Sequence, residues 1–248
     1  MKNRAIVWIT FYLIVTFLVF QNLGYASQGH DITAADILRH MRSTSSEIED
    51  YTVRLRAEID MEKVRVPPMD ITVYYKQPDK IHLQSKGFAM LPRDGIFINP
   101  NRFSKEDFYM SLLGKETLKN VETYKIELVP RKEEIKIRKL TMWVDPERWI
   151  FLKVHTVSWR GLSAHVDFEY ALFQDKYWLP VSAIAIINFA GFKGFLPYYK
   201  MLGREKKNAS KSDDKSGRIT IQFSDYKINV GLSDSIFEQQ KDVLPGID

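Results

Sequence analysis

Cysteine is absent from all 248 residues of the chain. Without it, neither a disulfide framework nor a zinc–thiolate site can form. The chain also lacks the cysteine that carries the lipid of a bacterial lipoprotein. Folded stability must therefore come from the burial of apolar groups rather than from cross-links.

Histidine is scarce, and the motifs of metal and nucleotide enzymes are missing. The sequence contains no HExxH or HxH spacing, no GxSxG elbow, no P-loop and no GxGxxG stretch. These absences argue against the common hydrolase and nucleotide-binding classes, and they predict a protein without metal or cofactor. The five histidines are His30, His40, His82, His155 and His165, of which the last two are expected to pair across neighbouring strands.

Charge of one sign is not concentrated anywhere in the chain. Lysine and arginine number 36 against 31 acidic residues, which gives a formal net charge of +5. Such a mild excess, without a basic face, predicts no nucleic-acid binding. It favours at most a transient contact with anionic lipid head groups at a membrane surface.

The N-terminus has the pattern of a secretory signal. Lys2 and Arg4 precede an apolar run over residues 5–20, and Gly24 and Ala26 are the small residues that a signal peptidase recognises. The run is shorter than the roughly 20 residues that span a bilayer as a helix, which favours a cleaved signal over a retained anchor. We expect cleavage after Ala26 and a periplasmic location.

Residues 27–248 are predicted to form a single, mainly β domain with a few helices. Thr33 suits the N-cap of one helix, because Asp36 follows three residues later and Ile37, Leu38 and Met41 fall at helical spacing. Beyond it, apolar and polar residues alternate as in half-buried antiparallel strands. The expected strands are 51–60, 71–75, 80–84, 124–130, 137–145, 149–159, 163–173, 178–189 and 218–229.

Three other segments have distinct patterns. Residues 105–113 are predicted to form a short helix with Phe108 and Leu112 on one face. Residues 232–237 form a closing segment. The stretch 203–217 is charged and rich in small residues, with almost nothing to bury, and is predicted to be a mobile loop.

One face of the predicted sheet carries more apolar side chains than these helices can cover. Such a sheet either closes into a packed barrel or wraps around helices and leaves a cavity for an apolar guest. The second solution makes the inward residues candidates for a lipid-cavity lining. They are Val53, Leu55, Ile59, Ile71, Val73, Leu140, Met142, Val144, Ile150, Leu152, Val154, Val166, Phe168 and Tyr170.

The segment 191–199 favours this second solution. It sets apolar and aromatic residues between glycines, next to the charged stretch, as in a lid or an interfacial contact. An amphipathic core helix is the alternative. The candidate lid or membrane-contact residues are Phe192, Phe195, Leu196 and Tyr198.

In the order of its segments, the chain resembles the LolA/LolB-like periplasmic lipoprotein carriers and the related outer-membrane lipoprotein-sorting proteins. Residues 74–81 (Tyr-Tyr-Lys-Gln-Pro-Asp-Lys-Ile) stand in the place of the family's strand–proline turn. Residues 140–150 resemble its Val-Asp-Pro hairpin, and residues 221–237 resemble its ending. Carriers of the best-known kind have, in that turn, an arginine that fastens a lid helix, and this chain has Gln77 there.

The resemblance implies a fold and a function. The fold is an unclosed antiparallel β-barrel of about eleven strands wrapped around lid helices. Members bind the acyl chains of lipoproteins or other amphiphiles, and they carry them across the periplasm without catalysis. Exposure of an acyl chain to water costs about 0.8 kcal/mol per CH₂, so a soluble carrier must provide a dry cavity.

We therefore predict a non-catalytic carrier that moves lipids or lipoprotein acyl chains toward the outer membrane, with partner proteins at the inner and outer membranes. Two alternatives remain. One is an envelope interaction or sensor module of the same fold that binds a protein partner. The other is an esterase-like or glycosidase-like enzyme that uses Asp167 and Glu169.

Overall fold

The computed structural model describes residues 31–61, 64–65, 67–85, 99–135, 137–159, 161–188 and 216–238. The description below concerns the compact unit that begins at Thr33. The predicted signal over residues 1–26 lies outside the described residues. So do 203–215 of the predicted loop and the candidate contacts Phe192, Phe195, Leu196 and Tyr198.

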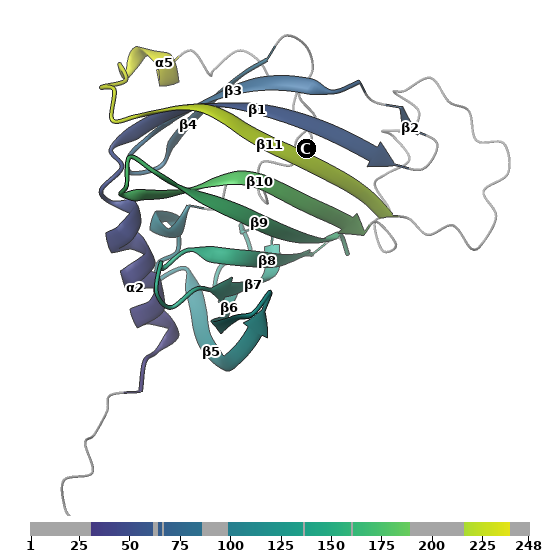
Figure 1. Cartoon of the computed structure of the whole chain (residues 1–248). Coiled ribbons are helices and arrows are strands. Elements are labelled where there is room, and N and C mark those ends of the chain that lie inside the picture. The colour runs from purple at the N-terminus through teal and green to yellow at the C-terminus, as the bar shows by residue number, and fades with distance from the viewer. Residues whose placement is uncertain are drawn as a thin grey trace, which may run out of the picture. The chain divides into compact units, whose positions relative to one another are not determined.

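Most of the described chain is a single antiparallel sheet (Figure 1). Ten strands follow the order β4-β3-β1-β11-β10-β9-β8-β7-β6-β5, and β2 pairs with β1 beside this path. The strands are β1 (Asp50–Met61), β2 (Val64–Arg65), β3 (Met69–Lys76), β4 (Lys80–Ser85), β5 (Phe108–Leu118), β6 (Val121–Pro130), β7 (Ile137–Val144), β8 (Phe151–Ser158), β9 (Ser163–Phe173), β10 (Tyr177–Asn188) and β11 (Ser216–Ile228).

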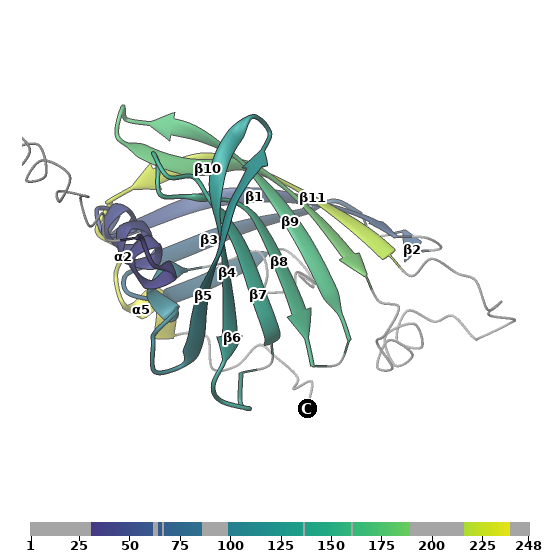
Figure 2. The same cartoon turned by 90° about the horizontal axis from the view of Figure 1, so that it is seen from below.

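The sheet curls around a common interior but does not close. β4 and β5 stand at the two ends of the strand order, and no ladder joins them within the described ranges. Figure 2 shows the strands fanning around the interior from below. This architecture confirms the predicted mainly β fold, an unclosed antiparallel barrel with few helices.

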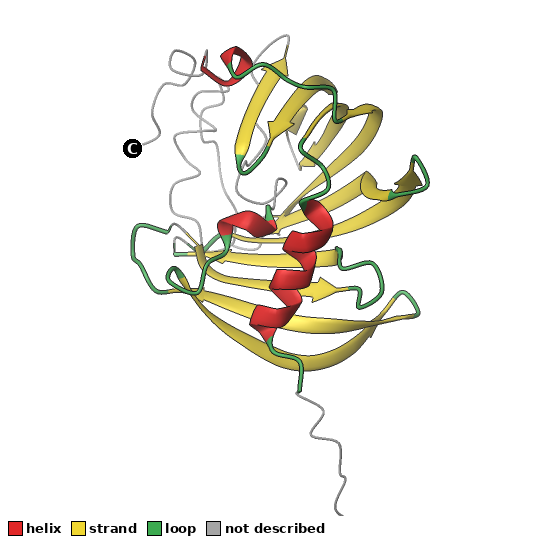
Figure 3. Ribbon diagram, turned by 90° about the vertical axis from the view of Figure 1, so that its left-hand side faces the viewer, coloured by secondary structure: helices red, strands yellow, loops and turns green. Residues whose placement is uncertain are grey.

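Helix α2 (Ala34–Ser45) lies across one end of the curled sheet (Figure 3). Thr33 Oγ1 accepts from the backbone N–H of Asp36 at 3.2 Å, and the Asp36 carboxylate accepts from the Thr33 N–H at 3.1 Å. This reciprocal pair is a capping box. Ile37, Leu38 and Met41 are the large buried side chains of this helix. The predicted helix and its N-cap are therefore confirmed.

Two shorter helical segments complete the structure. The 3-10 helix η1 (Pro100–Arg102) contacts α2, and α5 (Ser235–Glu238) contacts β4. Among the described residues, no helix is long and apolar enough to span a membrane.

Aliphatic side chains fill much of the concave interior. Val53 stands opposite Val73, and Val154 pairs with both Met142 and Val166 on the neighbouring strands. All five side chains are almost fully buried. Burial of a Val, Leu or Met side chain stabilises the fold by about 1.5–3 kcal/mol, so these cross-strand contacts fix the register of the sheet.

The helix predicted over residues 105–113 is wrong. Ser104 starts only one helical turn, in which its carbonyl accepts from the Phe108 N–H at 3.0 Å, and β5 then begins. Phe108 and Leu112 do share a face, but a spacing of four residues satisfies a strand of period two as well as a helix. Pairing along the whole of β6 decides for the strand.

The boundary of the predicted loop also moves. β11 begins at Ser216, so the last two residues of the 203–217 stretch belong to a strand.

Candidate functional site

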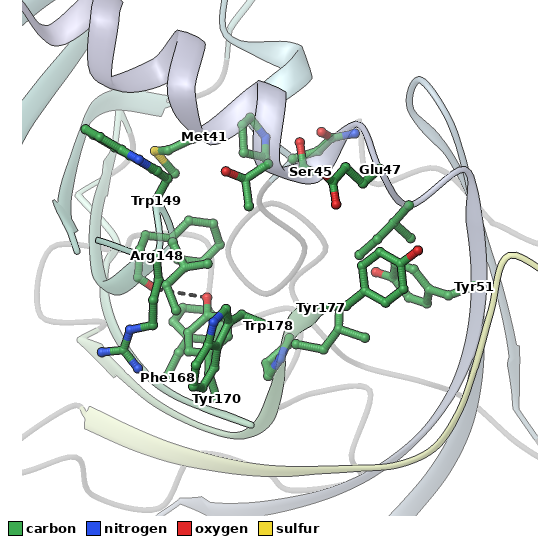
Figure 4. A pocket seen from close by; sticks show the side chains of 18 of the residues that line it. Met41, Ser45, Glu47, Tyr51, Arg148, Trp149, Phe168, Tyr170, Tyr177 and Trp178 are labelled. Carbon is green, nitrogen blue, oxygen red and sulfur yellow. Dashed lines mark hydrogen bonds between the residues drawn. The ribbon is translucent and has the colours of Figure 1, made fainter. Parts of the chain in front are cut away.

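The interior is hollow at the end that α2 covers. A pocket of about 470 Å³ opens there, beside the C-terminal end of the helix (Figure 4). Its wall combines residues 41–48 with the 145–150 turn and with parts of β1, β9, β10 and β11. The volume lies within the range of roughly 300–1,000 Å³ that is typical of small-molecule sites.

Aromatic rings dominate the wall of this pocket. Some of them already pack on one another: the rings of Tyr51 and Tyr75 stack with centroids 5.0 Å apart, and Phe151 meets Phe168 edge-on at 5.1 Å. These contacts hold the wall in one arrangement. The aromatic lining residues are Tyr51, Tyr75, Trp149, Phe151, Phe168, Tyr170, Tyr177, Trp178, Phe223 and Tyr226.

Several of the tyrosine hydroxyls are satisfied by the backbone. Tyr170 Oη donates to the Phe151 carbonyl at 2.9 Å, and Tyr226 Oη donates to the Pro180 carbonyl at 2.8 Å. Burial raises the pKa of both phenols well above its usual range. They are therefore neutral donors at any physiological pH.

The hydroxyl of Tyr51 is different. Within the described part of the chain it makes no hydrogen bond, although its ring is packed between Tyr75 and Tyr226. Burial is the main reason that the pKa of Tyr51 is raised, so this hydroxyl keeps its proton. The pocket wall thus carries an unused donor.

A buried carboxylate organises the turn that forms one side of the pocket. Asp145 is only 1% exposed, and its Oδ1 accepts from the N–H groups of Glu147 at 2.8 Å and Arg148 at 3.1 Å. Its Oδ2 accepts from Arg148 Nε at 2.6 Å. The guanidinium then lies 4.9 Å from the centre of the Trp178 ring. The predicted Val-Asp-Pro hairpin is therefore a rigid part of the site.

Trp149, in the same turn, connects the sheet to the helix. Its ring stacks on His40 of α2 at 4.3 Å and on Tyr124 of β6 at 6.3 Å. The backbone of Trp149 has a φ of 54°, a conformation that residues other than glycine rarely adopt. The tight turn and the stacking together place the ring against α2.

The segment after α2 is fastened to the sheet by side-chain amides. Gln77 Nε2 donates to the carbonyls of Ser46 at 2.8 Å and Ile48 at 2.7 Å. Asn229 accepts from the Glu49 N–H at 2.8 Å and donates to the Glu47 carbonyl at 3.1 Å. Gln77 therefore holds the end of the helix from the turn position where the resembled carriers have an arginine.

An ion pair closes the same corner. Lys176 Nζ lies 3.3 Å from Glu47 Oε2, and both residues line the pocket. Lys176 also lies 5.1 Å from the centre of the Tyr177 ring. The two cations that line the pocket, Arg148 and Lys176, thus each contact an acidic and an aromatic neighbour.

The candidate lining residues fall into three groups. Val53, Ile150, Phe168 and Tyr170 line the pocket. Ile59 and Leu152 are half-buried and lie away from it. The remaining candidates are buried in the packed interior outside the pocket, namely Leu55, Ile71, Val73, Leu140, Met142, Val144, Val154 and Val166.

Strand irregularities explain why part of the aromatic lining escapes a simple alternation rule. A bulge in the β7–β8 ladder sets Phe151, and not Leu152, opposite Val144. A second bulge opposite Val53, where Asp225 has a φ of 56°, brings Tyr226 to the pocket. The available sequence signal is the clustering of aromatic residues next to turns, as at Trp149 and at Tyr177–Trp178.

The candidate acidic residues lie on the other face of the sheet. Asp167 and Glu169 alternate with the buried Val166 and Phe168, and Glu169 is exposed, 3.7 Å from Lys119. Neither residue lines the pocket. Within the described ranges, no group of three or more His, Cys, Asp or Glu side chains is placed to hold a metal ion.

The predicted histidine pair is confirmed on this outer face. His155 and His165 are direct cross-strand partners, and their rings stack with centroids 3.9 Å apart. Burial, followed by the neighbouring His165, lowers the pKa of His155 to about 4. The pair is therefore neutral near neutral pH.

These features define an open antiparallel barrel with an internal pocket capped by a helix. Three solved structures share this fold. One is a domain of an outer membrane lipoprotein-sorting protein from Vibrio parahaemolyticus, with a TM-score of 0.59 and 13% identity over 83% of this chain and 96% of that one.

The second is a DUF1329 family protein from Desulfovibrio piger, with a TM-score of 0.56, 13% identity and coverage of 82% and 95%. The third is a LolA superfamily protein from Nitrosomonas europaea, with a TM-score of 0.55, 14% identity and coverage of 83% and 97%. No family profile and no curated protein match the sequence. The chain thus has the LolA-like fold that its sequence predicts.

Proposed function

We propose that the protein is a non-catalytic carrier that binds an apolar or amphiphilic molecule in the aromatic pocket. The observation that carries this proposal is the hollow itself. Protein interiors are normally packed as densely as organic crystals, and the strands of this barrel do pack densely elsewhere. An apolar space of about 470 Å³ next to that packed interior is suited to a guest.

The polar groups around the pocket support binding rather than reaction. Asp145 is bonded to the turn and to Arg148, and Glu47 is paired with Lys176. The hydroxyls of Tyr170 and Tyr226 are bonded to carbonyls. A general acid or base must reach the substrate with a free proton site, and these groups are committed to holding the wall.

A carrier role in the periplasm agrees with two further observations. The N-terminal sequence has the pattern of an export signal. The fold is shared with an outer membrane lipoprotein-sorting protein domain and a LolA superfamily protein. Delivery to a membrane requires contact with its surface or with partner proteins at the inner and outer membranes, and these contacts are part of the proposal.

The test combines extraction with a matched pair of variants. Protein purified from its native envelope should release a bound apolar molecule, detectable by mass spectrometry of an organic extract. Trp178→Ala removes half-buried lining from the pocket and should weaken the binding of a fluorescent apolar probe by about tenfold. Trp159→Ala is the control, because Trp159 is exposed and outside the pocket lining.

Both variants should have a melting temperature close to that of the parent protein, so that their affinities for the probe can be compared directly. An empty extract, together with no uptake of either a linear or a ring-shaped probe, would contradict the carrier function.

A further inference from the structure

We propose that the molecule carried is a rigid, ring-bearing apolar compound with a hydroxyl or carbonyl oxygen, rather than a straight acyl chain. This inference rests on the carrier function proposed above and specifies the ligand of the same pocket. It is carried by the kind of side chains that form the wall and by the Tyr51 hydroxyl, which makes no hydrogen bond to a described residue.

The rings that face the pocket are not all engaged with other rings. Trp149 has ring partners in His40 and Tyr124. In the described part of the chain, Trp178 and Phe223 have no ring partner, although both line the pocket. Figure 4 shows Trp178 and Tyr170 on one side of the chamber and Tyr51 and Tyr177 on the other. A flat ligand between these two sides can gain ring contacts that the protein does not make with itself.

The rigidity of the wall selects for a rigid guest. Tyrosine and tryptophan side chains have few rotatable bonds, so they offer large contact areas in a fixed shape. A straight chain must lose rotamer freedom at every bond when it enters such a chamber, whereas a fused-ring compound has little freedom to lose. Flexible side chains such as methionine suit varied chains better, and Met41 is the only methionine among the described lining residues.

Tyr51 indicates where the oxygen of the ligand is placed. Its neighbours Tyr75 and Tyr226 use their hydroxyls on the Pro78 and Pro180 carbonyls. The Tyr51 hydroxyl makes no such hydrogen bond to a described residue, and because Tyr51 lines the pocket, this hydroxyl is free to donate to a ligand. A ligand oxygen at this point would satisfy it. The charged side chains nearby already form two pairs, Arg148 with Asp145 and Lys176 with Glu47. The pocket therefore does not require a charged group on the ligand.

Two fluorescent polyenes distinguish the ligand classes. Dehydroergosterol is a fused-ring alcohol, and cis-parinaric acid is a linear fatty acid, and both accept energy from protein tryptophans. Titration of the full chain should give a dissociation constant at least about tenfold lower for dehydroergosterol. An equal or tighter affinity for cis-parinaric acid would overturn the inference while leaving the carrier function intact.

A single-atom change tests the proposed contact. Tyr51→Phe keeps the ring and removes the hydroxyl, so binding of dehydroergosterol should weaken about threefold to tenfold while binding of cis-parinaric acid is unchanged. Tyr74→Phe is the matched control, since Tyr74 bonds Gln84 and does not line the pocket. Unchanged sterol binding by Tyr51→Phe would refute the contact. If neither probe binds the parent protein and nothing co-purifies with it, the carrier function itself fails.

Discussion

The two halves of the barrel interior are made by the same strands yet differ in their chemistry. β9 has Val166 in the packed half and Tyr170 at the pocket, and β11 has Ile221 in the packed half and Phe223 at the pocket. Branched aliphatic side chains interdigitate and leave little void. Large flat rings that brace one another edge-on hold a space open. One sheet therefore combines a stabilising core with a binding chamber, and the residue type along each strand marks the boundary.

The largest expected effect separates the two halves at a single ladder position. Leu55 and Phe223 are cross-strand partners, but Leu55 is fully buried while Phe223 is half-buried and lines the pocket. Leu55→Ala should lower the free energy of unfolding by about 2–5 kcal/mol, as cavity-forming substitutions do. Phe223→Ala should cost less than half as much, because its ring already borders open space.

Urea denaturation followed by circular dichroism measures both values. If both variants lose the same free energy of unfolding, the pocket half is packed as tightly as the rest of the interior, and the proposed difference between the two halves is wrong.

A smaller effect is expected from the turn that supports the aromatic half. Asp145→Asn leaves Arg148 without its carboxylate and weakens the bonds to the turn. The expected loss of stability is about 1–3 kcal/mol, and probe binding should weaken because Trp149 and Trp178 lose their support. Asp175→Asn is the control, since Asp175 is exposed, does not line the pocket and makes no ion pair in the described ranges. Denaturant titration and probe binding, measured on the same variants, would show whether the turn supports both the stability of the fold and the binding of a ligand.

The last effect depends on pH and concerns the outer face, away from both halves. An unfolded histidine is protonated near its usual pKa of 6.5, whereas His155 in the folded protein takes its proton only near pH 4. Between these values the unfolded state binds more protons, so stability rises with pH across the window and is lost as the pH falls from about 6.5 to 4. Urea midpoints measured across this window should fall less steeply in His155→Gln. The facing groups are His165, Lys139, Lys153 and Asp167.

Local patterns account for the parts of the fold that the sequence predicts correctly. Thr33 and Asp36 mark the start of α2, and β9 follows its alternation from Ala164 to Glu169. The prediction for β5 is wrong because the spacing of Phe108 and Leu112 fits both a helix and a strand. Pairing with the next strand, β6, decides between them.

The pocket is harder to predict than the core. Alternation identifies Val53 and Phe168, but the bulges beside Leu152 and Asp225 change which residues face inward. Such bulges depend on how two strands pair, and the strands of the second bulge, β1 and β11, lie far apart in the chain. The hollow itself follows from how several rings pack together, which no single segment specifies.

The fastening of α2 by Gln77 has a consequence for how firmly the pocket is roofed in different surroundings. A guanidinium or ammonium group at this position would hold the helix partly through its charge, and added salt would weaken that hold. The amide of Gln77 has no charge to screen and no proton to gain or lose in the physiological range. Its two short bonds to the Ser46 and Ile48 carbonyls therefore keep the same strength as ionic strength and pH vary. The Glu47–Lys176 ion pair at the same corner, in contrast, is weakened by added salt.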